Sequence, residues 1–468
     1  MSTQFKNVDH KLFKDLGSIV PYYDSFFTVS EHKNRDKKLA DECEHVSFDV
    51  LGQSTDKNDI WSISIGGGKY TAFLFAAPHP NEPIGSMTID FLIHQLAKDD
   101  DLRESLDYEF IFIKTADIDG TVLNQGWFDG PFTISNYAQN FYRPASYEQV
   151  EWTFPLEYKN YKFDSPMPET EILMSVIAEH KPDVIYSLHN AGFGGCYYYI
   201  SHNISPIFDD LRQVSRDTGV PLDLGEPESP WMNEFGDAVF QMPSAIEQYD
   251  YYEQETQQDP TEVINSGAGS FDFAKKHNSD VVEIATELPY FYDPQIQSDE
   301  LTEQSRKEII IEGADQEEQI VSFVTTQYER VADNLPASRI KESVDEVTKK
   351  FLDRIDAKRE WAQSNSELDT KATVAQTTDA TTIRPFYRIL YMGTFMRLLD
   401  HAAMNKDSSN NDRIESVKST VESRFHELIG QLLNDLDYTA IPIHDLVTIQ
   451  SRAGLIVLDY LQKSEHLE

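Results

Sequence analysis

The first 300 residues alternate between short apolar segments of strand character and longer segments with helical periodicity, and this alternation restricts the possible folds. The apolar segments, rich in β-branched and aromatic residues, are residues 70–77, 108–116, 183–188 and 280–288. Between them, residues 83–99 and 168–181 space apolar side chains three and four positions apart, and each begins at a proline. The pattern predicts an α/β fold with a mixed, largely parallel, doubly wound sheet flanked by helices.

The chain changes character after about residue 300. No glycine occurs between Ala314 and Met392, and the segments there are long, charged and helically periodic. We therefore expect an all-helical C-terminal region, with an α/β domain at residues 1–335 and a helical extension at residues 336–468. Residues 363–382 are expected to form a polar loop. The extension should pack as a bundle beside the sheet and either shape access to a site or mediate homo-oligomer formation.

Charge and composition exclude several classes of partner. The chain has 40 Lys and Arg against 80 Asp and Glu, a net charge of −40. Such a surface repels phosphate backbones and anionic lipids, so we expect neither nucleic-acid nor membrane binding. No segment approaches the roughly 20 apolar residues of a membrane span, and the N-terminus lacks the apolar stretch of a signal peptide. Because Cys43 and Cys196 also lack the spacing of a disulfide framework, we expect a cytoplasmic protein.

Three histidines are followed three positions later by an acid, so this spacing alone identifies no metal site. The pairs are His79/Glu82, His180/Asp183 and His277/Asp280. His79 and Glu82 lie between a predicted strand and a predicted helix, at the carboxyl edge where open α/β sheets bind ligands. The other two pairs precede strands, where loops mostly connect elements. We therefore interpret only His79 and Glu82 as candidate metal ligands.

Two further residues end predicted strands at the same edge. His189 follows residues 183–188, and Glu287 lies at the end of residues 280–288. Hydrolytic zinc takes about three protein ligands, and two histidines with one glutamate form a known set, while a nearby carboxylate can take a proton from the attacking water. His189 is thus a candidate third ligand, or else a half-buried hydrogen-bond donor, and Glu287 is the candidate base. Glu283 lies deeper in the same strand and is interpreted as a buried or paired acid.

Several segments resemble, in order, the zinc metallocarboxypeptidases of the carboxypeptidase A type. They are HPNE at 79–82, PETEIL at 168–173, HKPDVIYSLHNAGFGG at 180–195 and GAGSFDFAKKHNSDVVEIATELP at 267–289. The resemblance, to a divergent, bacterial-like member, runs from about residue 22 to about residue 294. It implies that His79, Glu82 and His189 hold one zinc ion and that Glu287 is the general base. In this family an arginine between the two zinc motifs polarises the scissile carbonyl, which implies Arg143; the alternative for Arg143 is a surface ion pair.

The chain departs from this family at two positions that recognise a C-terminal carboxylate. An Asn-Arg pair is expected where this chain has QVEWTFP, residues 149–155, and a tyrosine is expected where it has Ile264. The resemblance therefore implies a complete metal and base set with altered substrate recognition. Either Arg143 or another arginine binds the terminal carboxylate, or the substrate presents another group. The charge of −40 should also disfavour acidic peptides in approach.

Three functions compete on these residues. The first is a zinc metallopeptidase of restricted specificity, which hydrolyses a peptide or peptide-like amide with metal-activated water. The second is a zinc-dependent N-acyl amino acid deacylase of the aspartoacylase or succinylglutamate desuccinylase type. The third is a non-catalytic binding protein on the same fold. The PETEIL segment and the long interval from Ser270 to Glu287 favour the first, while retention of every ligand and the base argues against the third.

Overall fold

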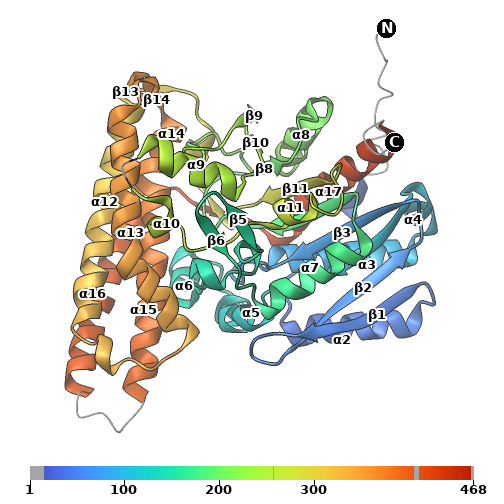
Figure 1. Cartoon of the computed structure of the whole chain (residues 1–468), viewed down its shortest axis with the longest axis horizontal. Coiled ribbons are helices and arrows are strands. Elements are labelled where there is room, and N and C mark those ends of the chain that lie inside the picture. Colours follow the sequence, from blue (N-terminus) through green and yellow to red (C-terminus); the bar gives the residue numbers. More distant parts are fainter. Residues whose placement is uncertain (1–14, 257, 405–410, 465–468) are drawn as a thin grey trace.

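A mixed nine-stranded sheet forms the centre of the part of the chain that the computed structural model describes, residues 15–256, 258–404 and 411–464 (Figure 1). Its order is β1-β2-β4-β3-β7-β11-β8-β10-β9. The strands are β1 (Val46–Gln53), β2 (Asp59–Gly66), β3 (Tyr70–Ala76), β4 (Tyr108–Ile113), β7 (Val184–His189), β8 (Tyr197–Ile200), β9 (Glu234–Gly236), β10 (Val239–Gln241) and β11 (Val282–Glu287). The four central strands, β4, β3, β7 and β11, are mutually parallel. The predicted mixed α/β sheet is confirmed, with antiparallel pairs on both sides of this parallel centre.

Alternate side chains of the central strands enter two different cores. In β3, Leu74 and its even-numbered neighbours pack into the core that contains α3 (Ile84–Lys98) and α17 (Ile443–Lys463). Phe73 and Phe75 pack into the opposite core, which contains α7 (Pro168–His180). This alternation follows from the two-residue period of a strand and explains why the segment is apolar throughout.

Further helices surround the sheet and its connecting loops (Figure 1). They are α2 (Val29–Glu42), α4 (Asp100–Ser105), α5 (Ile118–Asn124), α6 (Ile134–Asn140), α8 (Phe208–Thr218), α9 (Ala245–Glu255), α10 (Pro260–Val263) and α11 (Ser270–Ala274). The short strands β5 (Leu156–Tyr158) and β6 (Tyr161–Phe163) form a separate hairpin. No helix among the described residues has both the length and the apolar composition that a membrane span requires.

Four long helices stand beside the sheet (Figure 1, left). They are α12 (Arg306–Glu329), α13 (Arg339–Ser364), α15 (Arg384–Met404) and α16 (Asn411–Asp435). Two short strands interrupt the expected all-helical region: β14 (Lys371–Thr373) pairs with β13 (Leu301–Ser305), and β15 (Thr439–Ala440) pairs with β12 (Phe291–Tyr292). These pairs join the helical region to the segment that follows β11.

The expected polar loop at residues 363–382 is wrong, because most of this segment has regular structure. It contains β14, the helix α14 (Val374–Thr378) and a π-helical turn over Asp379–Ile383 that continues into α15. Thr373 caps α14 in a capping box with Gln376, a pattern that composition alone conceals. Serine and threonine are thus helix caps here, in agreement with their preference for helix N-termini.

The last helix, α17, lies against the sheet and not in the bundle. Gln450 donates to the carbonyl oxygens of His189 (2.8 Å) and Thr286 (3.3 Å), and Thr88 donates to Gln450 (2.9 Å). One buried glutamine therefore joins α17 to the ends of β7 and β11 and to α3. The expected boundary at residue 335 stays a prediction, but α17 belongs to the core of the α/β sheet.

Close packing of α17 on β7 gives a stability prediction. A Cβ atom at Gly454 would lie 2.5 Å from Cε1 of Tyr186. We therefore expect Gly454→Ala to destabilise the protein by about 1–3 kcal/mol, because the buried ring must move. The matched control is Gly430→Ala in α16, where no atom lies within 4 Å and alanine should stabilise the helix by up to about 1 kcal/mol. Denaturant unfolding of both variants measures the contrast, and equal effects would contradict this packing.

Candidate active site

The predicted ligand and base positions lie at the carboxyl ends of three adjacent strands. His189 ends β7 and is the register partner of Glu287, which ends β11. β3 pairs with the other side of β7, and its last residue, Ala76, is opposite Leu188. The loop that carries His79 and Glu82 therefore starts next to the ends of β7 and β11. This placement agrees with the rule that open α/β sheets bind ligands at the carboxyl edge.

A tight turn between β3 and α3 brings Glu82 back toward His79. The backbone N–H of Glu82 donates to the carbonyl of His79 (3.1 Å). The side chain of Asn190, directly after His189, accepts from the N–H of Ile84 (3.3 Å) and so joins the start of α3 to the end of β7. Gly85 permits this approach, because a Cβ there would lie 2.7 Å from Cβ of Leu188.

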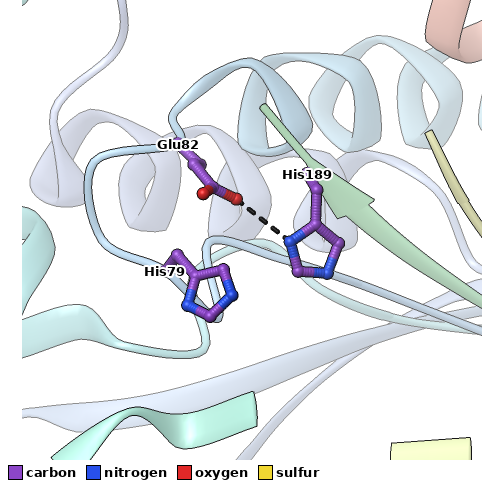
Figure 2. A group of neighbouring side chains, drawn as sticks. All are labelled: His79, Glu82 and His189. Carbon is purple, nitrogen blue, oxygen red and sulfur yellow. Dashed lines mark hydrogen bonds and ion pairs between the residues drawn. The ribbon is translucent and has the colours of Figure 1, made fainter. Parts of the chain in front are cut away.

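His79, Glu82 and His189 point toward one another (Figure 2). One potential ligand atom from each lies within 4.8 Å of the other two, and all three residues are buried. Nδ1 of His189 lies 3.1 Å from Oε2 of Glu82, and the two imidazole rings are 5.1 Å apart between centroids. Within the described ranges, this is the one group of three His, Cys, Asp or Glu residues with such convergence.

The environment of His79 is that of a metal ligand. Its Nδ1 atom is buried and has no hydrogen-bond partner among the described residues. Burial lowers the pKa of His79 well below its usual value, and the positive charges of Arg143 and His189 lower it further. The imidazole is therefore neutral, as metal coordination requires. A buried nitrogen with no partner costs free energy, which a bound cation would recover.

His189 is held in one orientation from both sides of its ring. Nε2 lies 2.6 Å from Oγ of Ser187, and Nδ1 faces Glu82. Burial opposes protonation, but the hydrogen bond to Glu82 and the charge of Glu287 outweigh it and raise the pKa of His189 to about 9. Nδ1 thus faces the carboxylates of Glu82 and Glu287, at 3.1 and 3.9 Å. Because Nε2 is engaged by Ser187, Nδ1 is the ring nitrogen that faces Glu82 and the centre of the group.

Glu287 lies beside this group without belonging to it. Its Oε1 atom is 3.9 Å from Nδ1 of His189, and its side chain is mostly buried. Burial raises the pKa of Glu287 well above its usual range; the positive charge of His189 opposes this shift and the negative charge of Glu82 adds to it. A carboxylate with a raised pKa is a better proton acceptor, as a general base needs.

Arg143 is turned into the site and does not form a surface ion pair. Nη1 donates to Oε1 of Glu82 (3.3 Å), and Nε donates to Oε1 of Gln149 (3.1 Å). Its guanidinium lies over the indole of Trp152, at 5.6 Å, and the same indole contacts the ring of His79 edge-on, at 5.3 Å between centroids. Gln149 and Trp152 are not predicted as site residues from the sequence, where the only signal is the departure of residues 149–155 from the family pattern.

A second pair of acids lies behind the site. Oγ of Ser270 lies 2.7 Å from a carboxylate oxygen of Glu151 and 2.7 Å from one of Glu283. Both residues are buried, and burial raises the pKa of each. Glu283 is therefore a buried, hydrogen-bonded acid, in agreement with its interpretation from strand geometry.

Five other histidines among the described residues lie away from this group. His180 ends α7 and His277 follows α11, and both side chains are exposed. In the helical region, His401 and His426 lie on α15 and α16, and His444 hydrogen-bonds the carbonyl of Gly17 (3.0 Å). None of the five belongs to the group of three around His79. His466 lies outside the described residues.

A family model for zinc carboxypeptidases matches residues 36–307, more than half of the chain. The chain therefore belongs to the zinc carboxypeptidase family. All the proposed ligands, Arg143 and Glu287 lie inside the matched residues, whereas α13 to α17 lie outside them. The family depends on zinc, and the His-Glu-His group fits a metal of this kind.

Comparisons with solved structures find metallocarboxypeptidases, whereas the curated proteins give no match. Carboxypeptidase A from Helicoverpa armigera is 14% identical, with 60% of this chain and 70% of that one covered and a TM-score of 0.39. Bovine thrombin-activatable fibrinolysis inhibitor, in complex with tick carboxypeptidase inhibitor, is 11% identical, with 57% and 87% covered and a TM-score of 0.35. A metallo-carboxypeptidase from Pseudomonas aeruginosa, in complex with (2-guanidinoethylmercapto)succinic acid, is 15% identical, with 56% and 60% covered and a TM-score of 0.34.

Proposed function

We propose that this protein is a zinc-dependent hydrolase that cleaves a peptide or peptide-like amide bond, with Glu287 as the general base. The observation that carries the proposal is the convergence of His79, Glu82 and His189 within 4.8 Å at the ends of adjacent elements. The buried, unpartnered Nδ1 of His79 and the neutral state of its ring support a metal there. One zinc ion, when bound, would act as a Lewis acid and make water a stronger nucleophile at neutral pH.

Glu287 is proposed to move the protons of the reaction. Its carboxylate lies at the strand end next to His189, so a water molecule near the ligands is within its reach. It would accept a proton from the attacking water and later deliver it to the amine that leaves. The raised pKa of Glu287 favours the first of these transfers, because a carboxylate with a higher pKa holds a proton more strongly.

Arg143 is proposed to stabilise the negative charge that develops on the scissile carbonyl oxygen. Nη1 and Nε are held by Glu82 and Gln149, while Nη2 takes part in no hydrogen bond among the described residues. Nη2 is therefore the nitrogen free to donate to an oxyanion. The two fixed nitrogens and the Trp152 ring orient the guanidinium for this role.

Recognition of the substrate terminus is proposed to differ from that of a broad carboxypeptidase. In the stretch where the family has Asn-Arg, this chain places the Trp152 ring against His79, so no guanidinium comes from that position. We propose a restricted exopeptidase or amidase whose substrate presents an amide, a side-chain-linked residue or a cell-wall peptide in place of an ordinary free C-terminus.

A paired substrate series tests this function. Zinc content is measured together with hydrolysis of an N-acyl dipeptide and an N-acyl amino acid. Hydrolysis of the dipeptide alone supports a peptidase, and hydrolysis of the N-acyl amino acid alone supports a deacylase. If the zinc-loaded protein hydrolyses neither substrate, the result contradicts the proposal that it is an enzyme.

Substrate ends are compared with peptides that carry either a free or an amidated C-terminus. Loss of one charged hydrogen bond to a terminal carboxylate costs about 1.5–3 kcal/mol, or more than tenfold in binding. We therefore expect kcat/KM values for free and amidated peptides to differ by less than about tenfold. A strong preference for free carboxylates across many terminal residues would restore the ordinary carboxypeptidase assignment.

A further inference from the structure

A cavity of about 410 Å³ lies between the bundle and the loop at residues 226–232. Helices α12, α13 and α15 supply much of its wall, and most of its lining residues lie outside the residues 36–307 that match the family. Its aromatic side chains are Trp231, Tyr251, Tyr252, Phe351 and Trp361. This volume lies within the roughly 300–1,000 Å³ typical of sites for small ligands.

Three cations on two helices form what we call the basic wall of this cavity: Arg354, Lys358 and Arg388. Arg354 and Lys358 are four residues apart on α13, so both face the same side of the helix as Phe351. The guanidinium of Arg388 on α15 lies 4.7 Å from the Phe351 ring centroid, and that of Arg354 lies 5.3 Å from it. The aromatic ring thus holds two guanidinium groups near each other.

The basic wall has more positive charge than its acidic partners neutralise. Glu317 accepts from both Lys358 (3.0 Å) and Arg388 (2.7 Å). Burial opposes the ionisation of Glu317, but Lys358 and Arg388 outweigh it and lower its pKa to about 2. Arg354 donates to Glu346 (2.8 Å), so three cations share two carboxylates.

The acids are also farther from solvent than the cations. The side chains of Glu317 and Glu346 are 2% and 6% exposed, whereas those of the three cations are 24–31% exposed. Hydrogen bonds among the described residues use Nε of Arg388 and Nη2 of Arg354 but neither Nη atom of Arg388. The two Nη atoms of Arg388 are therefore free to donate to a ligand.

The rest of the wall carries two cations and four acids. Arg306 pairs with Glu226, and Arg384 pairs with Asp379. Two further acids, Glu228 and Glu367, line the cavity and are exposed; Glu228 accepts from the hydroxyls of Tyr197 (2.6 Å) and Tyr199 (2.9 Å). The excess of positive charge is therefore confined to the basic wall itself, in a chain with a net charge of −40.

The cavity shares part of its lining with a smaller cavity near the candidate active site. This smaller cavity, of about 40 Å³, shares five lining residues with it, among them Glu228 and Arg384. Its other lining residues include Ala191, two positions after His189, and Tyr197, which is the register partner of Glu287. The residues that line the two cavities thus extend from the basic wall to Ala191 and Tyr197, next to His189 in the chain and Glu287 in the sheet.

We propose that this cavity binds the carboxylate of an acidic side chain in the substrate peptide, at a residue some distance from the scissile bond. The inference rests on the proposed function in taking a peptide as substrate. The hydrogen bond between a carboxylate and a guanidinium group is stronger than one between two neutral side chains. The aromatic side chains of the cavity contact the rest of the peptide. The local cations offset the repulsion that the overall negative charge exerts on acidic peptides.

Direct binding tests the cavity without relying on catalysis. The probes are acetyl-Glu-Glu-Ala-Ala-amide and acetyl-Gln-Gln-Ala-Ala-amide, titrated calorimetrically into the full-length protein with and without added zinc. We expect the glutamate peptide to bind at least about tenfold more tightly, in both metal states, because one or more charged hydrogen bonds distinguish the two. Equal affinities for the two peptides would overturn the proposal.

Matched variants locate the preference. Arg388→Gln should reduce the preference for glutamate by about tenfold, and Arg354→Gln provides the same test if the first variant fails to fold. The control is Arg359→Gln, which removes the same charge from α13; Arg359 pairs with Asp315, Glu318 and Asp356 and does not line the cavity. An equal reduction in the control would mean that long-range charge, and not the cavity, causes the preference.

Kinetics then separate this inference from the proposed function. Acetyl-Glu-Glu-Ala-Phe and acetyl-Gln-Gln-Ala-Phe are compared, and we expect the glutamate peptide to have a KM at least about fivefold lower in wild type but not in Arg388→Gln. If the protein hydrolyses both peptides with equal KM, the cavity does not bind the acidic side chain of the substrate, and the proposal fails. If the zinc-loaded protein hydrolyses neither peptide, the proposed function fails, and the binding titration still decides whether the cavity selects carboxylates.

Discussion

Replacing Glu287 by glutamine is expected to lower kcat by about 10² to 10⁴ while zinc content and fold stay unchanged. Glutamine has nearly the same shape as glutamate but cannot accept a proton from water. Glu287 lies 3.9 Å from His189 and outside the group of three ligands, so its charge is not needed to complete that group. The measurement is kcat on the best substrate of the series, with zinc determined on the same sample.

Glu283→Gln is the matched control for this variant. Glu283 lies on the same strand and faces the same side, but its carboxylate is buried against Ser270 and Glu151. Glutamine at this position removes one of two neighbouring acids, Glu283 and Glu151, and leaves Glu287 and the three candidate ligands unchanged. We expect kcat within about tenfold of wild type, since only an indirect effect on geometry remains. Equal losses from the two variants would mean that the base is assigned wrongly.

The edge of the sheet that carries the site was predictable because it depends on local patterns. Strand segments of six to nine residues locate the ends of β3, β7 and β11, and parallel strands place those ends together. The sequence alone therefore places His79, Glu82, His189 and Glu287 at one edge of the sheet. It also set aside His180 and His277, which lie at the opposite ends of their strands and are exposed.

Residues that act through long-range contacts were not predictable in this way. Gln450 lies 261 positions after His189 and joins it only because α17 packs on the sheet. Trp152 ends a short 3₁₀ turn and Gln149 lies between two such turns, whose geometry has no periodic signal. The strands β8, β9 and β10 have three or four residues each, too few for alternation to show. Tertiary packing determines these elements more than their own sequence does.

The helical region shows the same division between local and distant information. Positive side chains four residues apart on α13 and on α15 are visible in the sequence, and they favour a solvated face on each helix. Only the packing of the two helices places Arg354 and Arg388 on one aromatic ring. A sequence of this composition therefore predicts an acidic surface but not a basic wall within it.

His79→Ala is expected to remove nearly all zinc and nearly all activity. Three protein ligands hold a hydrolytic zinc, and a site with two has a much lower affinity. Zinc measured by atomic absorption should fall from about one ion per chain to less than about a tenth of that. His180→Ala and His277→Ala serve as controls, since both side chains are exposed and far from the group in the sheet, and each should retain full zinc and activity.

The stability of the metal-free protein distinguishes a ligand from a structural histidine. Nδ1 of His79 has no hydrogen-bond partner among the described residues, so alanine there removes an unsatisfied buried nitrogen along with some packing. We expect the metal-free wild type and His79→Ala to unfold at similar denaturant concentrations, whereas added zinc should stabilise only the wild type, by about 2.7 kcal/mol at 100 times its Kd. If His79→Ala unfolds much earlier without metal, the ring supports the fold and the ligand assignment loses its main physical argument.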